Sequence, residues 1–145
     1  MAVDVLTEIV IDRPYDRVAA YAGDPSNAPE WYANIQSVRW RTKPPVGVGS
    51  QMDFVARFLG RTLSYTYEVV ESAPDRLVMR TAEGPFPMET TYTWTPIGNA
   101  QTRMTLRNRG EPAGFTRIAA PMMATAMRRA NEKDLARLKQ ILESS

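Results

Sequence analysis

Residues 113–145 carry the longest helical pattern of the chain, and this segment most limits what the chain can form. Apolar side chains recur every three or four residues along it, which places them on one stripe of a helix. Pro121 is expected to kink this helix or to restart it, because a proline removes one backbone hydrogen bond. A stripe of this length requires a broad apolar surface to pack against.

The two halves of the predicted helix differ in the side chains of the stripe. Leu135 and Leu138, in the second half, are typical of a packed core. Met122, Met123 and Met127, in the first half, occupy positions where leucine would pack more specifically, and methionine tolerates irregular partners. The second half is therefore predicted to belong to a core, and the first half to cover a space.

Alternation of apolar and polar residues predicts strands through most of the remaining chain. The predicted strands are residues 3–11, 35–42, 51–59, 62–71, 76–82, 87–95 and 101–109. Short connections at Gly60-Arg61 and Gly98-Asn99 indicate hairpins, which require antiparallel pairing. Two short helices are predicted between the first two strands, near residues 15–22 and 28–32.

This order of elements is typical of one α+β domain spanning residues 1–145. An antiparallel sheet commonly buries only one of its faces. The predicted helix at 113–145 is the element long enough to cover that face. The sheet is therefore expected to curl, with the helix lying across its concave side.

The face of the sheet that meets the helix is unusual for a plain core. Strand parity places tyrosines, threonines, an asparagine and a tryptophan there, where a solid core would use Leu, Val and Ile. Two interpretations remain open: the polar groups reach water at the sheet edge, or they line a cavity. In the second interpretation, the candidate ligand-binding residues are Phe54, Phe58, Tyr65, Tyr67, Met79, Tyr92, Trp94, Asn108, Met122, Met123 and Met127.

The composition excludes several kinds of chemistry. The 145 residues include no cysteine and no histidine, which removes thiolates, the commonest zinc ligand and a Ser-His-Asp triad. No metal site and no cofactor are expected. A net charge of +2 with interspersed acids and bases gives no indication of nucleic-acid binding. Asp4 and Glu8 interrupt the first apolar run, so a cytoplasmic protein without membrane insertion is expected.

Several short motifs of the sequence resemble those of one superfamily. They are the run IDRPYDRV at 11–18, Asp24 followed by Trp31, Gly49, Val69-Val70-Glu71 followed by Pro74-Asp75-Arg76, and Leu135, Leu138, Lys139 and Leu142. Together they resemble the START-like (SRPBCC) superfamily and, within it, the polyketide cyclase/dehydrase family. This resemblance implies a helix-grip fold, in which a curved seven-stranded antiparallel sheet wraps around the C-terminal helix with a hydrophobic cavity between them. The motifs assign no catalytic residue, and Trp31 is interpreted as a packing residue.

The resemblance leaves three functions open. The first is binding of a hydrophobic small molecule, lipid-, aromatic- or polyketide-like, in a cavity of roughly 300–1,000 Å³. The second is a polyketide aromatase/cyclase or dehydratase that uses the same cavity without a metal or a covalent intermediate. An inward-facing acid beside the tyrosines would favour this second function. The third is a protein-partner role with a filled interior; for each, a monomer or homodimer is expected.

Overall fold

The computed structural model describes residues 3–111 and 120–145, and its elements follow the predicted order. They are β1 (Val3–Ile11), α1 (Tyr15–Ala22), η1 (Pro25–Asn27), α2 (Ala28–Trp31), β2 (Ile35–Trp40), β3 (Gln51–Phe58), β4 (Arg61–Ala73), β5 (Arg76–Glu83), β6 (Met88–Ile97), β7 (Gln101–Gly110) and α3 (Ala120–Glu143). Pro121 lies in the first turn of α3, where a missing N–H costs nothing. The predicted helical residues 113–119 lie outside the described residues.

The seven strands form one antiparallel sheet in the order β1-β7-β6-β5-β4-β3-β2. Gly60 (φ +78°) connects β3 to β4, and Gly98 (φ +62°) connects β6 to β7. Both lie in the left-handed region, which glycine adopts without the clash that a Cβ atom causes. The two predicted hairpins are therefore confirmed.

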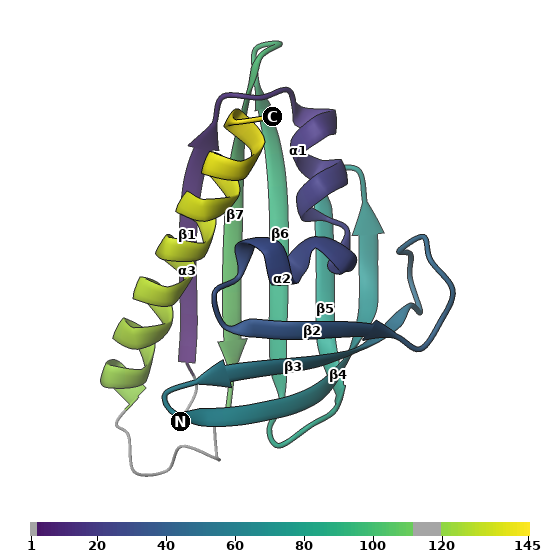
Figure 1. Ribbon diagram of the computed structural model, residues 1–145, viewed down its shortest axis with the longest axis vertical. Coiled ribbons are helices and arrows are strands. Elements are labelled where there is room, and N and C mark those ends of the chain that lie inside the picture. Colours follow the sequence, from purple (N-terminus) through teal and green to yellow (C-terminus); the bar gives the residue numbers. More distant parts are fainter. Residues whose placement is uncertain (1–2, 112–119) are drawn as a thin grey trace.

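The sheet is strongly curved, and α3 lies against its concave side (Figure 1). In this view β1, β7, β6 and β5 run along the long axis, whereas β2 and β3 run across them. Helix α3 packs along β1, and α2 contacts both β2 and α3. This arrangement confirms the predicted α+β helix-grip fold with its seven-stranded sheet.

The second half of α3 belongs to the main core. Leu135, Leu138 and Leu142 are buried in a cluster with residues of the sheet and of α1. Trp31 is fully buried in the same cluster. Its ring centroid lies 4.1 Å from that of Tyr32, which agrees with the packing role expected from the sequence.

The last turn of α3 is fastened to the connection between β1 and α1. The Asp12 N–H donates to Glu143 Oε2 at 2.7 Å, and Arg13 Nη2 donates to the Glu143 carbonyl at 2.6 Å. Lys139 Nζ also donates to the Val10 carbonyl at 2.8 Å. These bonds hold the C-terminal end of the helix at a fixed place on the sheet.

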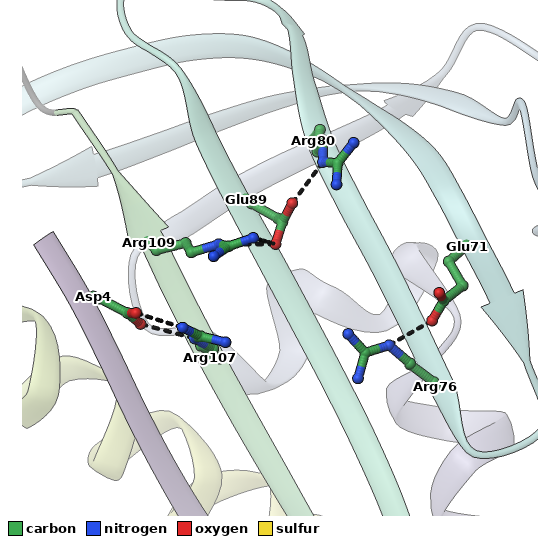
Figure 2. A network of polar contacts seen from close by, with 7 residues as sticks. All are labelled: Asp4, Glu71, Arg76, Arg80, Glu89, Arg107 and Arg109. Atoms are coloured by element: carbon green, nitrogen blue, oxygen red, sulfur yellow. Dashed lines mark hydrogen bonds and ion pairs between the residues drawn. The ribbon is translucent and has the colours of Figure 1, made fainter. Parts of the chain in front are cut away.

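The opposite face of the sheet carries charged residues in ion pairs (Figure 2). Arg107 forms two hydrogen bonds with Asp4, and Glu89 accepts from both Arg80 and Arg109. Glu71 pairs with Arg76 on neighbouring strands. The charges that alternate with the inner residues along the strands therefore lie on the solvent side.

Candidate ligand-binding site

A cavity of about 130 Å³ lies between the first half of α3 and the concave face of the sheet. Residues of β3, β4, β6, β7 and α3, together with the segment after α2, supply most of its described walls. Its volume is smaller than the 300–1,000 Å³ expected from the sequence, so that expectation is wrong for this conformation. Aromatic rings fill part of the space and so reduce its volume. The ring centroids of Phe54 and Tyr65 lie 5.5 Å apart with the rings stacked, and those of Tyr65 and Tyr67 lie 5.0 Å apart with the rings edge-on.

Most residues predicted to bind a ligand do line this cavity. They are Phe54, Phe58, Tyr65, Tyr67, Met79, Tyr92, Asn108, Met123 and Met127. They come from β3, β4, β5, β6, β7 and α3, so only the folded sheet and helix bring them together. Whether they contact a ligand stays a prediction.

Two of the predicted residues lie elsewhere. Met122 is 68% exposed, so the prediction that it faces the sheet is wrong. Its neighbour Met123 is buried, and successive residues of a helix point about 100° apart. Trp94 lies on the inner face as predicted but near the other end of β6, where its ring approaches Gly23 after α1 and lines a separate recess with Ala19 and Leu77.

Several polar residues of the cavity wall, among them Tyr32, Asn131 and Asp134, were not identified from the sequence. Asn131 and Asp134 of α3 are 4% and 2% exposed, and Tyr32 follows α2. The available signal was the gap in the apolar stripe between Ala130 and Leu135. Asn131 and Asp134 continue the stripe one turn after Met127 and Ala130, so two polar side chains take inward positions there.

Asp134 is the buried carboxyl group of the cavity wall. Its Oδ1 accepts a hydrogen bond from the Ala33 N–H at 3.0 Å. Burial raises its pKa from 3.8 to about 6, although the bond from Ala33 and the charge of Lys133 act in the opposite direction. A carboxyl group with this pKa exchanges its proton close to neutral pH.

A chain of hydrogen bonds crosses the polar end of the cavity from β4 to α3. The hydroxyl oxygens of Tyr67 and Thr90 lie 2.8 Å apart, and Thr90 Oγ1 donates to Asn108 Oδ1 at 2.6 Å. Asn108 Nδ2 then donates to Asn131 Oδ1 at 3.2 Å. The chain ends at Asn131 Nδ2, which is buried and has no partner among the described residues.

Four tyrosine hydroxyls also converge on this end. The hydroxyls of Tyr32 and Tyr92 lie 2.6 Å apart, and those of Tyr65 and Tyr67 interact with this pair electrostatically. Burial raises the pKa of Tyr67 to about 12 and raises the pKa values of Tyr32, Tyr65 and Tyr92 as well. All four therefore remain neutral hydrogen-bonding groups at physiological pH.

The described residues offer little to a metal ion. Within residues 3–111 and 120–145, no group of three or more carboxyl side chains is close enough to hold a cation. In the same ranges, no helix has the length and apolarity needed to cross a membrane.

Solved structures that resemble this chain share its whole architecture. TTHA0849 from Thermus thermophilus is 22% identical, with a TM-score of 0.79 and 97% of each chain covered. A START superfamily protein from Mycobacterium smegmatis is 16% identical, with a TM-score of 0.83 and 97% of each chain covered. The Zhui aromatase/cyclase from Streptomyces sp. R1128 is 15% identical, with a TM-score of 0.79, covering 99% of this chain and 94% of the other. No sequence match is found among curated proteins.

The fold and its cavity define a START-like protein of the helix-grip type. The chain belongs to the family described as "Polyketide cyclase / dehydrase and lipid transport", whose model matches residues 2–143. The family and fold agree with either hydrophobic-ligand binding or a polyketide cyclase role.

Proposed function

We propose that the protein binds a small, largely apolar molecule in the cavity between α3 and the sheet. The observation that carries this proposal is an interior space that the core side chains leave open beside two buried polar residues, Asn131 and Asp134. A plain core closes such a space, because an unfilled cavity costs stability.

The size of the cavity indicates which part of a ligand it accepts. An engineered apolar cavity of about 150 Å³ in another protein holds one benzene molecule, so the present volume of about 130 Å³ corresponds to one ring. A longer lipid or a polyketide requires more room. Met123 and Met127 supply it most readily, because an unbranched thioether chain changes rotamer at low cost.

Filling the cavity tests this proposal. Met127→Trp should abolish ligand binding, whereas Met122→Trp, on the exposed side of the same helix, should leave it unchanged. Binding is measured by native mass spectrometry against single-ring aromatics, fatty acids, sterols, flavonoids and polyketides, and folding by circular dichroism. Undiminished binding by a folded Met127→Trp variant would place the ligand elsewhere. Absence of any binder for the unchanged protein would contradict the proposal.

A second candidate is cyclisation or dehydration of a polyketide in the same cavity, and Asp134 is the observation that favours it. An acid beside tyrosines can transfer a proton, and its pKa of about 6 suits general acid–base catalysis near neutral pH. The hydroxyls of Tyr32 and Tyr92 would hold a carbonyl oxygen of the substrate as it becomes an enolate.

One substitution, Asp134→Asn, distinguishes the catalytic function from ligand binding alone. Asp134→Asn keeps the size of the side chain and the acceptor for the Ala33 N–H but removes the titrating proton. With a short poly-β-ketone thioester as the substrate, this variant should lose about 100-fold or more in the rate of water loss or ring formation, followed by mass spectrometry. Unchanged turnover in Asp134→Asn, or no turnover by the unchanged protein, would contradict the catalytic candidate and leave ligand binding as the proposed function.

A further inference from the structure

Among the described residues, the polar end of the cavity contains one open acceptor and one open donor, and this pair restricts the ligand. Asp134 has a single hydrogen bond among the described residues, from the Ala33 N–H to Oδ1, which leaves Oδ2 as an open acceptor. Asn131 Nδ2 is a buried donor without a partner among those residues. Leaving a buried polar group unpaired is unfavourable, so a ligand group that pairs with both gains affinity here.

The two open groups belong to the same face of α3. Asn131 and Asp134 are three residues apart on α3, and side chains at this spacing lie on the same face with Cβ atoms about 5–6 Å apart. A hydroxyl group donates one hydrogen bond and accepts others through the same oxygen. It therefore matches an acceptor and a donor placed side by side, whereas a carboxylate can only accept.

The charges around the cavity also favour a neutral hydroxyl group over a carboxylate. Arg109 is the one cationic residue among the described lining residues, and its guanidinium pairs with Glu89 on the outer face, with Nε 3.0 Å from Oε1 (Figure 2). A ligand carboxylate at the polar end would meet the Asp134 carboxylate, and the nearby charge of Lys133 comes from a residue outside the described lining. Like charges at short range in a buried site repel strongly.

We propose that this end of the cavity selects neutral hydroxyl-bearing ring compounds, with Asp134 Oδ2 accepting from the ligand hydroxyl and Asn131 Nδ2 donating to it, and that Asp134 rejects carboxylates. This inference rests on the proposed ligand-binding function and narrows it to a ligand class. Long-chain fatty acids in their ionised form are then poor ligands, whereas phenols and alcohols of similar apolar area are good ones.

The rejection of carboxylates should weaken in acid. Asp134 is faced by the hydroxyls of Tyr32 after α2 and Tyr92 of β6, and Lys133 is its charged neighbour on α3. The tyrosines remain neutral at and below neutral pH, so Asp134 is the group of this set that changes charge between about pH 5 and 8. Once protonated, it becomes a donor to a ligand carboxylate.

Three probes of one ring test the proposal: toluene, p-cresol and p-toluate, which differ in one substituent. At about pH 8, titration calorimetry should show that p-cresol binds at least about 10-fold more tightly than p-toluate. It should also bind more tightly than toluene. Asp134→Asn should reduce the ratio between p-cresol and p-toluate to about 3 or less, and Glu132→Gln, which removes an exposed acid of the same helix, should leave it unchanged. Lowering the pH to about 5 should reduce the ratio in the unchanged protein, since p-toluate remains mostly ionised there.

The outcomes separate the two proposals. Equal affinities for all three probes, or a ratio that Asp134→Asn and acid leave unchanged, would overturn the selection of hydroxyl ligands while binding stands. Absence of binding for all three probes and for the wider ligand panel would overturn the binding function itself. If Asp134→Asn does not fold, the pH series on the unchanged protein decides the selection alone.

Discussion

The Ala33 N–H donates to Asp134 Oδ1 across 3.0 Å, and this bond joins the segment after α2 to the middle of α3. It keeps the Asp134 side chain at the wall of the cavity in both protonation states, because a neutral carboxyl oxygen also accepts a hydrogen bond. The bond does not compensate the cost of burial, since the pKa of Asp134 is still raised to about 6.

This raised pKa predicts a pH dependence of stability. The folded state holds the Asp134 proton more tightly than the unfolded state, whose pKa is near 3.8, so stability falls as the pH rises from about 4 to about 6. At about 1.4 kcal/mol per pKa unit, the charged form costs roughly 3 kcal/mol above pH 6. Urea denaturation should therefore show Asp134→Asn more stable than the unchanged protein at pH 7–8 and nearly equal to it near pH 4. A difference that does not vary with pH would contradict the assignment to Asp134.

The hydrogen-bond chain through Thr90 predicts a cost for an isosteric change. Thr90→Val removes the bonds to Tyr67 and Asn108 and leaves both groups buried, so it should lower the free energy of unfolding by about 1–3 kcal/mol. Thr91→Val is the matched control, since Thr91 is also buried but forms no side-chain hydrogen bond with the described residues. Equal losses in thermal or chemical denaturation would mean that the chain contributes nothing specific.

The two halves of α3 should respond differently to truncation. Leu138 is fully buried in the main core, and Leu138→Ala should cost about 2–5 kcal/mol. Met127→Ala should cost less, because this side chain borders space that is already open, and the exposed Met122→Ala should cost least. Chemical denaturation of the three variants gives the order, and equal losses at 127 and 138 would indicate a solid core at the cavity.

The ion pairs of the outer face should contribute modestly and depend on salt. Although burial raises it, the pKa of Glu89 is lowered overall by the hydrogen bonds from Arg80 and Arg109. Its contribution is therefore present above its ordinary pKa of 4.5 and is lost as the pH falls through the lowered value. Glu89→Gln should cost about 1 kcal/mol at low ionic strength and less at 1 M salt, where exposed charges are screened. A larger loss, independent of salt, would show that Glu89 acts through packing.

Most of the fold could be predicted from local sequence patterns. Gly60 and Gly98 marked hairpins because only glycine adopts their positive φ without strain, and period-two parity identified the inner residues of five strands, β3 to β7. The antiparallel hairpins and the length of the last helix predicted a curled sheet with the helix across its concave side, and the family resemblance added the hydrophobic cavity between them.

Less of the candidate site could be predicted from the sequence. Parity placed Trp94 on the inner face but could not indicate that α1 covers that end of β6. Met122 and Met123 are adjacent and chemically identical, so only the rotation of α3 on the sheet decides which one is buried. Asn131 and Asp134 looked like surface residues because such side chains are mostly exposed, and their burial follows from contacts made by distant segments.

The bonds from Asp12 and Arg13 to Glu143 hold the C-terminal end of α3, and Met123 lies near its other end. Met123 lies about 30 Å from Glu143 along the helix axis, so a tilt of about 5° around Glu143 would move it by roughly 2.6 Å, whereas Leu135, about 12 Å from Glu143, would move by roughly 1 Å. Such a tilt widens the space beside Met123 and hardly disturbs the leucines. We therefore expect that, if the proposed cavity admits molecules larger than one ring, a small change in the angle of α3 is enough to make room for them.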